Sequence, residues 1–319
     1  PEPGPGEAVL AVTACGVCGS DLHFLDGTAR TSHVPITLGH EIAGLVVDPG
    51  NSGLRPRTPV VAVVGAHCGE CRRCIEGRPN LCERMAALGI HRDGGLADLV
   101  AVPTTSLVPI PDGLPPESAA TAVDAGATAH HAVTRTAALR PGETVLVIGA
   151  GGLGSYALQI ARRRGAAVVI VADTDPTALE RAHQLGADEV VAVTPGISVG
   201  RAVKLLTDGG VDVALEFVGR AATVDAAVKS LRPGGRAVAA GVGTEPVLTV
   251  PPVLWSNNEY QLRGSYGSLP GDVESVLAGL AAGELVAPPL ETVALDGAAE
   301  TILARSRGEG GGNRLMVLP

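Results

Sequence analysis

Aromatic residues, basic charge and long apolar runs are all scarce in this chain of 319 residues. Aromatic side chains make up 2% of the residues and hydrophobic ones 45%, so we expect a core of aliphatic side chains. The net charge of −9 argues against nucleic acid or an anionic membrane as a partner, because both require a basic face. No apolar run reaches the length of a membrane span, and no secretory or transit pattern is recognisable.

An initial methionine is also missing, since the chain begins Pro-Glu-Pro-Gly. We therefore expect the natural protein to have one or two further strands before Pro1. The length suits one large domain or two ordinary ones, with ample room for a core. The 43 glycines and 24 prolines predict many turns.

Cysteine is infrequent, but four of the six cysteines stand close together. Their spacing is Cys68-x-x-Cys71-x-x-Cys74 followed by Cys82. Four thiolates at such spacing suit a closed, tetrahedral structural zinc site. The competing interpretation is two disulfides, which cysteines this close in sequence would strain. Thiols held as metal ligands fit a reducing compartment, so we expect a cytoplasmic protein.

A second group of chemically active residues lies near the start of the chain. Its sequence is GVCGSDLH at 16–23 and GHE at 39–41. Cys18 and His40 are residue types that Zn²⁺ prefers, although both could instead be core residues. A catalytic zinc also needs a hydroxyl and an imidazole to carry a proton to solvent, and Ser20 and His23 can supply them. The alternatives are a helix cap for Ser20 and a surface position for His23.

The pattern of predicted secondary structure changes near residue 124. Before it, short β-like runs at 7–14, 42–47, 60–64 and 97–102 are interrupted by glycine, proline and the cysteine-rich segment. After it, apolar strands alternate with helical stretches from 144 to 240, which predicts βαβ units and a parallel sheet covered on both faces. The fold class is therefore α/β, with a doubly wound parallel sheet preceded by a mostly β part.

A glycine-rich loop follows the first of these strands. Its sequence is Gly149-Ala-Gly151-Gly152-Leu153-Gly154. Glycines let the backbone turn tightly and approach a pyrophosphate, whose charge sits at the N-terminus of the next helix. Asp173 ends the next strand, where a carboxylate accepts hydrogen bonds from the ribose of NAD and repels the 2′-phosphate of NADP. We expect NAD as cofactor; the alternative for Asp173 is a helix N-cap.

Taken together, these motifs resemble the zinc-dependent medium-chain dehydrogenase/reductases, the alcohol dehydrogenase family, and among them bacterial secondary-alcohol dehydrogenases. The resemblance covers nearly the whole chain and includes DGGLA at 93–97, LRPGG at 231–235 and NR at 313–314. It implies a GroES-like, mostly β catalytic domain at 1–123 and 264–319, and an inserted NAD-binding Rossmann domain at 124–263. It also implies a homodimer or homotetramer, usually formed through the last strand of the cofactor domain, here at about 259–265.

The resemblance assigns roles to the residues around the first motif. Cys18 and His40 resemble two ligands of the catalytic zinc, and Asp21 resembles the carboxylate that orients His40. Glu41 resembles a carboxylate that approaches the metal during ligand exchange.

The third zinc ligand is where the chain departs from the family pattern. The family usually has a cysteine in a Cys-x-Gly-x-Thr context, and this chain has Asp124 there. Carboxylate oxygen is an acceptable zinc ligand, and a Cys/His/Asp set resembles that of some bacterial secondary-alcohol dehydrogenases. The alternative is that Asp124 lies behind the ligands and zinc is weakly held or absent.

The remaining roles concern the proton and the cofactor. The counterpart of Ser20 accepts the proton of the alcohol and passes it through the cofactor ribose toward the position of His23. Thr128 matches a residue near the nicotinamide, and Arg314 matches one that binds the pyrophosphate.

The sequence thus predicts a NAD-dependent, zinc-dependent alcohol dehydrogenase with one catalytic and one structural zinc per subunit. Its substrate would be an alcohol, with a ketone or aldehyde as product, and a polyol or sugar-alcohol dehydrogenase is the alternative within the family. A zinc-free quinone or enoyl reductase that uses NADPH should lack the pair Cys18 and His40 and also Asp173. A non-catalytic sensor on the same fold would have no use for Ser20 and His23.

Overall fold

The computed structural model of the protein describes residues 1–247 and 250–319. This chain divides into two compact units, one made of Pro1–Ala127 and Gly267–Pro319 and the other of Thr128–Tyr266. Asp124 falls in the first unit. Among the described residues, no helix has both the length and the apolar character needed to cross a membrane.

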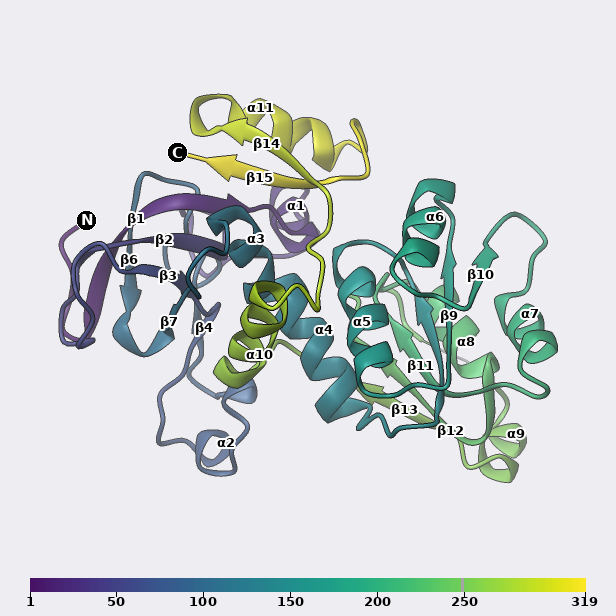
Figure 1. Ribbon diagram of the computed structural model, residues 1–319. Helices are drawn as coiled ribbons and strands as arrows, with labels where there is room; N and C mark the ends of the chain where they lie inside the picture. The colour runs from purple at the N-terminus through teal and green to yellow at the C-terminus, as the bar shows by residue number, and fades with distance from the viewer. Residues whose placement is uncertain (248–249) are drawn as a thin grey trace. The chain divides into compact units, whose positions relative to one another are not determined.

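The first unit is built on a seven-stranded sheet (Figure 1). Its path runs β14 (Leu290–Ala294), β15 (Arg314–Leu318), β1 (Glu7–Gly16), β2 (Glu41–Asp48), β3 (Pro59–Ala62) and β7 (Leu107–Pro109), and β6 (Leu99–Pro103) pairs with β1. The register places Gly16 opposite both Glu41 and Met316. The GHE motif and the C-terminal strand therefore meet at the end of β1, directly before Cys18.

The core of this unit is aliphatic, as its composition predicts. Leu10, Ile42 and Val60 are fully buried. The other elements are α1 (Gly19–Leu25), β4 (Gly65–Ala66), α2 (Arg72–Ile75), η1 (Pro79–Leu81), β5 (Ala86–Ala87), η2 (Thr104–Ser106), α3 (Pro116–Thr121), η3 (Ala122–Gly126), α10 (Pro270–Ala281) and α11 (Leu295–Ser306). The π-helical turn η3 follows α3 directly and carries Asp124.

The second unit is a doubly wound parallel sheet, which confirms the predicted fold class. Its strands lie in the order β10 (Glu189–Ala192), β9 (Val168–Asp173), β8 (Thr144–Ile148), β11 (Val211–Glu216), β12 (Leu231–Ala239) and β13 (Gln261–Gly264). Every pairing in it is parallel. The helical elements of the unit are α4 (Ala127–His131), η4 (Ala132–Thr136), α5 (Gly152–Arg163), α6 (Pro176–Gln184), α7 (Val199–Leu206), α8 (Ala221–Lys229) and α9 (Pro252–Asn257).

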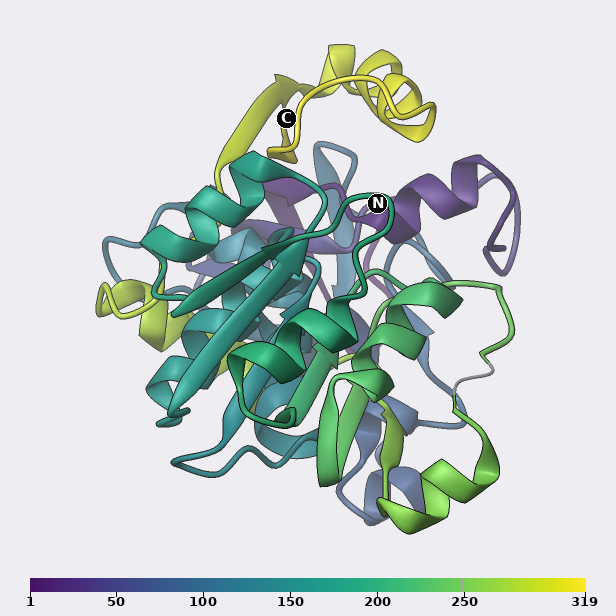
Figure 2. The ribbon, with the colours of Figure 1, turned by 90° about the vertical axis from the view of Figure 1, so that its right-hand side faces the viewer.

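The chain order of these strands fixes where a ligand can bind. From β8 the chain moves outward to β9 and β10, and then returns to place β11 on the other side of β8. Helices α5 and α6 cover one face of the sheet, and α7 and α8 cover the other (Figures 1 and 2). In such sheets ligands bind outside the carboxyl ends of the strands where the order reverses, here at β8 and β11.

Candidate metal and dinucleotide sites

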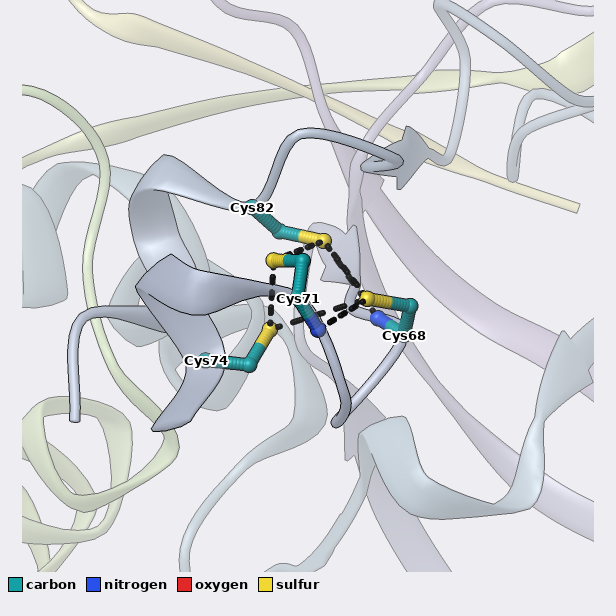
Figure 3. Close-up of side chains that lie close together, drawn as sticks. All are labelled: Cys68, Cys71, Cys74 and Cys82. Atoms are coloured by element: carbon teal, nitrogen blue, oxygen red, sulfur yellow. Dashed lines mark hydrogen bonds between the residues drawn. The ribbon is translucent and has the colours of Figure 1, made fainter. Parts of the chain in front are cut away.

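The four clustered cysteines form one compact sulfur site in a lobe of the first unit (Figure 3). Cys71 precedes α2, Cys74 lies within it, and Cys68 and Cys82 flank the segment. All four thiols are free, so the structure contains neither of the two disulfides that the sequence left open.

The spacing of the sulfurs fits a tetrahedral metal ion. Their separations are 3.5 Å for Cys71–Cys74 and for Cys68–Cys82, 3.8 Å for Cys71–Cys82 and 3.9 Å for Cys68–Cys74. Four sulfurs at about 2.3 Å from a zinc ion would stand about 3.8 Å apart. Each position is filled by protein, which leaves no place for a substrate.

Backbone amides favour the thiolate form in this lobe. The amides of Glu70 and Cys71 lower the pKa of Cys68 to about 6. Burial raises the pKa of Cys74 to about 12. A cation bound among the sulfurs would offset that cost, because thiolates are the form that binds zinc.

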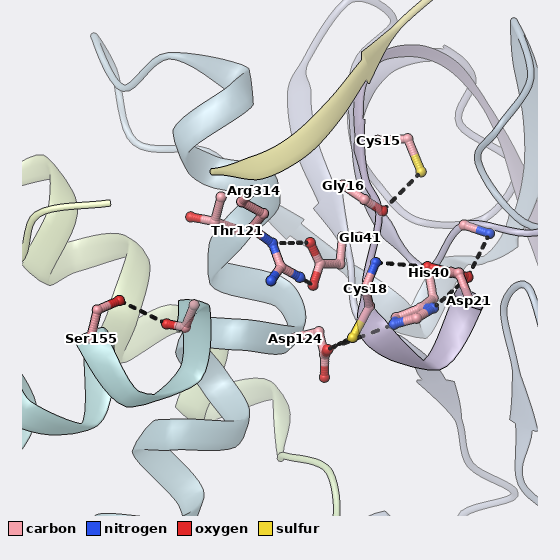
Figure 4. A network of polar contacts seen from close by, with 12 residues as sticks. Cys15, Gly16, Cys18, Asp21, His40, Glu41, Thr121, Asp124, Ser155 and Arg314 are labelled. Carbon is pink, nitrogen blue, oxygen red and sulfur yellow. Dashed lines mark hydrogen bonds and ion pairs between the residues drawn. The ribbon is translucent and has the colours of Figure 1, made fainter. Parts of the chain in front are cut away.

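The second cluster brings together Cys18, His40, Glu41 and Asp124, whose ligand atoms all lie within 4.8 Å of one another (Figure 4). Cys18 caps α1, His40 precedes β2, and Asp124 comes from η3. Asp124 Oδ2 lies 3.2 Å from Cys18 Sγ and 3.6 Å from His40 Nε2. Donor atoms around a tetrahedral zinc stand about 3.3 to 3.5 Å apart, so this trio also fits the metal.

Asp21 fixes the ring of His40 from behind. Its carboxylate is fully buried, accepts a 2.9 Å hydrogen bond from the Cys18 amide, and lies 3.4 Å from His40 Nδ1. Burial disfavours charge on His40, but Asp21 and Asp124 raise the pKa of His40 well above its ordinary value. The pocket is thus arranged to hold positive charge, and a metal ion at Nε2 would supply it.

Glu41 is held by Arg314. The guanidinium donates Nε–H to Glu41 Oε2 at 2.9 Å and pairs through its Nη2 with Oε1, and Glu41 is fully buried. A side chain at Gly16 would overlap the Glu41 carboxylate, so a larger residue there would displace the Glu41 side chain from its present position. The family resemblance implies that Arg314 binds a pyrophosphate and did not predict this ion pair.

The two proposed proton carriers lie on α1. Ser20 is the second residue of the helix and not its cap, since the cap is Cys18. His23 stands one turn further along the same face, with a half-exposed side chain and its Nδ1 3.7 Å from Asp26.

Three glycines of the loop in the second unit differ in backbone conformation and in the space around them. Gly149 has a φ of +91°, which favours glycine. A side chain at Gly154 would overlap the carbonyl oxygen of Gly149, whereas one at Gly151 would meet nothing within 4 Å. The loop is therefore tight on its inner side and open at Gly151, and α5 begins at Gly152 with Leu153 in its first turn. This open backbone at a helix N-terminus fits a pyrophosphate.

Asp173 ends β9 beside the same loop. Its Oδ2 accepts a 2.6 Å hydrogen bond from the Ala150 amide, and its Oδ1 accepts one of 2.9 Å from the Asp175 amide. The N-cap of α6 is Asp175, whose carboxylate accepts from the Thr177 amide, so Asp173 is not the cap. Thr128, in α4, is buried.

Comparison with known proteins identifies the family. The profile "Alcohol dehydrogenase GroES-like domain" matches residues 4–112, and "Zinc-binding dehydrogenase" matches residues 152–282. L-galactonate-5-dehydrogenase of Escherichia coli K12 is 33% identical over 296 residues, which cover 92% of this chain and 85% of that protein. The chain belongs to the zinc-dependent alcohol dehydrogenase family.

Other members of the family agree with this assignment. Sorbitol dehydrogenase of Bacillus subtilis 168 is 31% identical over 283 residues, which cover 86% of this chain and 80% of that protein. A protein of Sinorhizobium meliloti 1021, solved with NADP bound, superposes with a TM-score of 0.90 at 33% identity and covers 100% of this chain and 94% of that one. The protein is thus a zinc-dependent oxidoreductase that acts on alcohols or polyols, which confirms the family and reaction class predicted from the sequence.

Proposed function

We propose that this protein is a NAD-dependent alcohol dehydrogenase whose catalytic zinc is bound by Cys18, His40 and Asp124. The observation that carries the proposal is the meeting of these three donors at zinc-like separations. Three protein ligands leave a fourth position for the substrate, as catalytic zinc sites require. The cysteine lobe fills all four positions, and we assign it the structural zinc.

The chemistry divides between the bound groups and the chain. A zinc ion held by Cys18, His40 and Asp124 would supply Lewis-acid polarisation of the substrate oxygen, and a nicotinamide dinucleotide at the glycine loop would supply hydride chemistry. Ser20 accepts the proton of the alcohol at its Oγ, and His23 exchanges that proton with solvent, consistent with its half-exposed ring. Asp21 keeps the His40 ring oriented through Nδ1. Glu41 stands beside the ligands and is restrained by Arg314.

Selection of NAD over NADP is the part of the proposal that depends on Asp173. Its carboxylate is fixed at the glycine loop by the amides of Ala150 and Asp175, where it would repel a 2′-phosphate. The following residues, Thr174 and Asp175, supply no cation for such a phosphate. Thr128 next to the nicotinamide and Arg314 at the pyrophosphate remain assignments by family resemblance.

An edge strand supports the proposed assembly, and the free cysteines support the proposed location. Among the described strands β13 pairs only with β12, and its Leu262 is exposed. An exposed edge strand can pair with a second copy, so we propose a homodimer or homotetramer joined at β13. All six cysteines are free thiols, which fits a reducing compartment, so we propose a cytoplasmic location.

The substrate class has two candidates. A secondary or medium-chain alcohol is the first. The relatives named L-galactonate-5-dehydrogenase and sorbitol dehydrogenase favour the second, a polyol or sugar alcohol.

A spectrophotometric assay of NADH and NADPH formation tests the proposal. It would compare primary, secondary and polyhydroxy alcohols with NAD and with NADP. We expect zinc-dependent turnover with NAD on at least one of these alcohol classes. Absence of turnover with every alcohol by zinc-loaded protein would contradict the proposal.

A further inference from the structure

Glu216 is a buried carboxylate that the sequence analysis did not single out. It is the last residue of β11, pairs in register with Ile148 at the end of β8, and is only 1% exposed. It therefore lies where the strand order reverses, opposite Ile148, which directly precedes the glycine loop.

One oxygen of this carboxylate organises the loop that follows. Oε1 accepts hydrogen bonds from the Val218 amide at 2.7 Å and the Gly219 amide at 2.8 Å, and the Thr223 hydroxyl lies 2.8 Å away. These contacts tie residues 217–220 and the start of α8 to the end of β11. The backbone oxygen of Glu216 also accepts from the amides of Ala240 and Gly241, which follow β12.

The loop held in this way forms a wall against the glycine loop. A side chain at Gly149 would lie 2.8 Å from Val218 Cγ2, so Val218 packs directly on that glycine. Gly219, with a φ of +84°, is so close to the residues after β12 that a side chain on it would overlap the backbone of Val242. The position of Val218 is therefore set from both sides, and Glu216 fixes it.

This arrangement costs stability. Oε2 of Glu216 is buried and has no hydrogen-bond partner among the described residues. A buried carboxylate without a compensating charge is expensive, and a residue that breaks a local rule in this manner is expected at functional positions.

We propose that Glu216 is a positioning residue of the dinucleotide site, which sets cofactor affinity by holding Val218 against the glycine loop. This inference rests on the proposed dinucleotide binding. Glu216 acts through the loop, and the loop presents its backbone and Val218 to the ligand.

The test compares Glu216→Gln and Glu216→Ala with Asp212→Asn. Asp212 is a matched control, because it is a buried carboxylate on the same strand, accepts from the Thr144 amide and pairs with Arg232 at the opposite end. For each variant, the dissociation constants of NADH and NADPH are measured by calorimetry, together with Tm, zinc content and the KM for cofactor.

We expect Glu216→Ala to weaken NADH binding by about tenfold or more, since the acceptor of two loop amides is lost. Glu216→Gln keeps a carbonyl acceptor and should recover part of that affinity, with zinc content unchanged in both. Asp212→Asn should lower Tm without changing the dissociation constant. If Glu216→Ala binds NADH as tightly as wild type, or if both positions affect Tm alone, the inference is overturned. If Glu216→Ala does not fold, the inference is also overturned by a Glu216→Gln protein that has a lowered Tm but binds NADH as tightly as wild type. Wild-type protein that binds neither NADH nor NADPH would instead overturn the proposed function itself.

Discussion

The carboxylate of Asp124 lies 3.2 Å from the sulfur of Cys18, although 106 residues separate them in the sequence. The Cys18 thiol donates a hydrogen bond to Asp124 Oδ2, and a cation held between the two side chains would favour the thiolate beside the carboxylate. His40 completes the trio with its Nε2 3.6 Å from the same carboxylate oxygen. A bound zinc ion would resolve the charge balance of all three groups.

Metal content should match the two clusters, with about two zinc ions per chain. Cys74→Ser should lose the lobe zinc and lower Tm, because a structural zinc contributes folding free energy. Mass spectrometry of metals would measure this. The matched control is Cys15→Ala, which changes a buried thiol outside both clusters and should keep both ions. Protein purified without chelator that holds no zinc would refute the metal assignments.

Cofactor preference should change at Asp173. Wild type should reduce NAD in preference to NADP, and Asp173→Ala should narrow the ratio of the two kcat/KM values. The substitution removes both the repulsion of a 2′-phosphate and the ribose hydrogen bond, worth about 1.5 to 3 kcal/mol. Asp175→Ala is the control, because it removes the α6 cap, should cost about 1 kcal/mol of stability and should leave the ratio unchanged. Equal kcat/KM values for NAD and NADP in the wild type would contradict the role proposed for Asp173.

The two glycines of the dinucleotide loop should respond differently to alanine. Gly151 has φ −69° and ψ −156° and open space at its Cβ position, so Gly151→Ala should keep Tm while weakening NADH binding. Gly154→Ala places a methyl against the Gly149 carbonyl and should lower the unfolding free energy by about 1 to 3 kcal/mol. Thermal unfolding and calorimetric titration separate the two effects. A Gly151→Ala protein that binds NADH normally would mean that the ligand does not approach this backbone.

Lowering the pH should destabilise the second unit, because protonation of Glu143 weakens its ion pair with Arg236. Burial alone would raise the pKa of Glu143, but the hydrogen-bonded guanidinium of Arg236 holds it below its ordinary value of 4.5. Because the folded-state pKa is depressed, this stabilisation is present above about pH 4.5 and is lost as the pH falls through the folded-state value. Glu143→Gln should therefore lower Tm at neutral pH, and its difference from wild type should shrink below that pH. The exposed Glu189→Gln serves as control, and a Tm difference that stays constant with pH would contradict the assignment.

Local pattern was enough to predict much of the fold. Strand β8, the glycine loop and α5 follow from an apolar run, a glycine cluster and a helical stretch that all point to the same unit. Helices α10 and α11 and the strands β14 and β15 were not predicted. Strand β15 pairs with β1 across almost the whole length of the chain, and neither segment encodes its partner.

The types of residue that form the sites could be predicted from the sequence, but the contacts between those residues could not. The cysteine spacing was sufficient for the lobe, because its ligands are neighbours in sequence. The ion pair between Arg314 and Glu41 depends on the register of three strands, which sequence alone does not fix. Glu216 had one usable signal, a charged residue at the end of an otherwise apolar strand, but its hydrogen bonds to Val218 and Gly219 appear only in the fold.

The central claim is that Asp124 completes a catalytic zinc site, and the zinc content of Asp124→Ala tests it most directly. We expect this variant to keep the lobe zinc, to lose the catalytic zinc and to lose turnover, while NADH still binds. Asp124→Cys should retain both ions, because thiolate is also a zinc ligand. Glu117→Gln, on the adjoining helix α3, is the control and should behave as wild type. Full occupancy of both zinc sites with normal turnover in Asp124→Ala would show that Asp124 is not a zinc ligand.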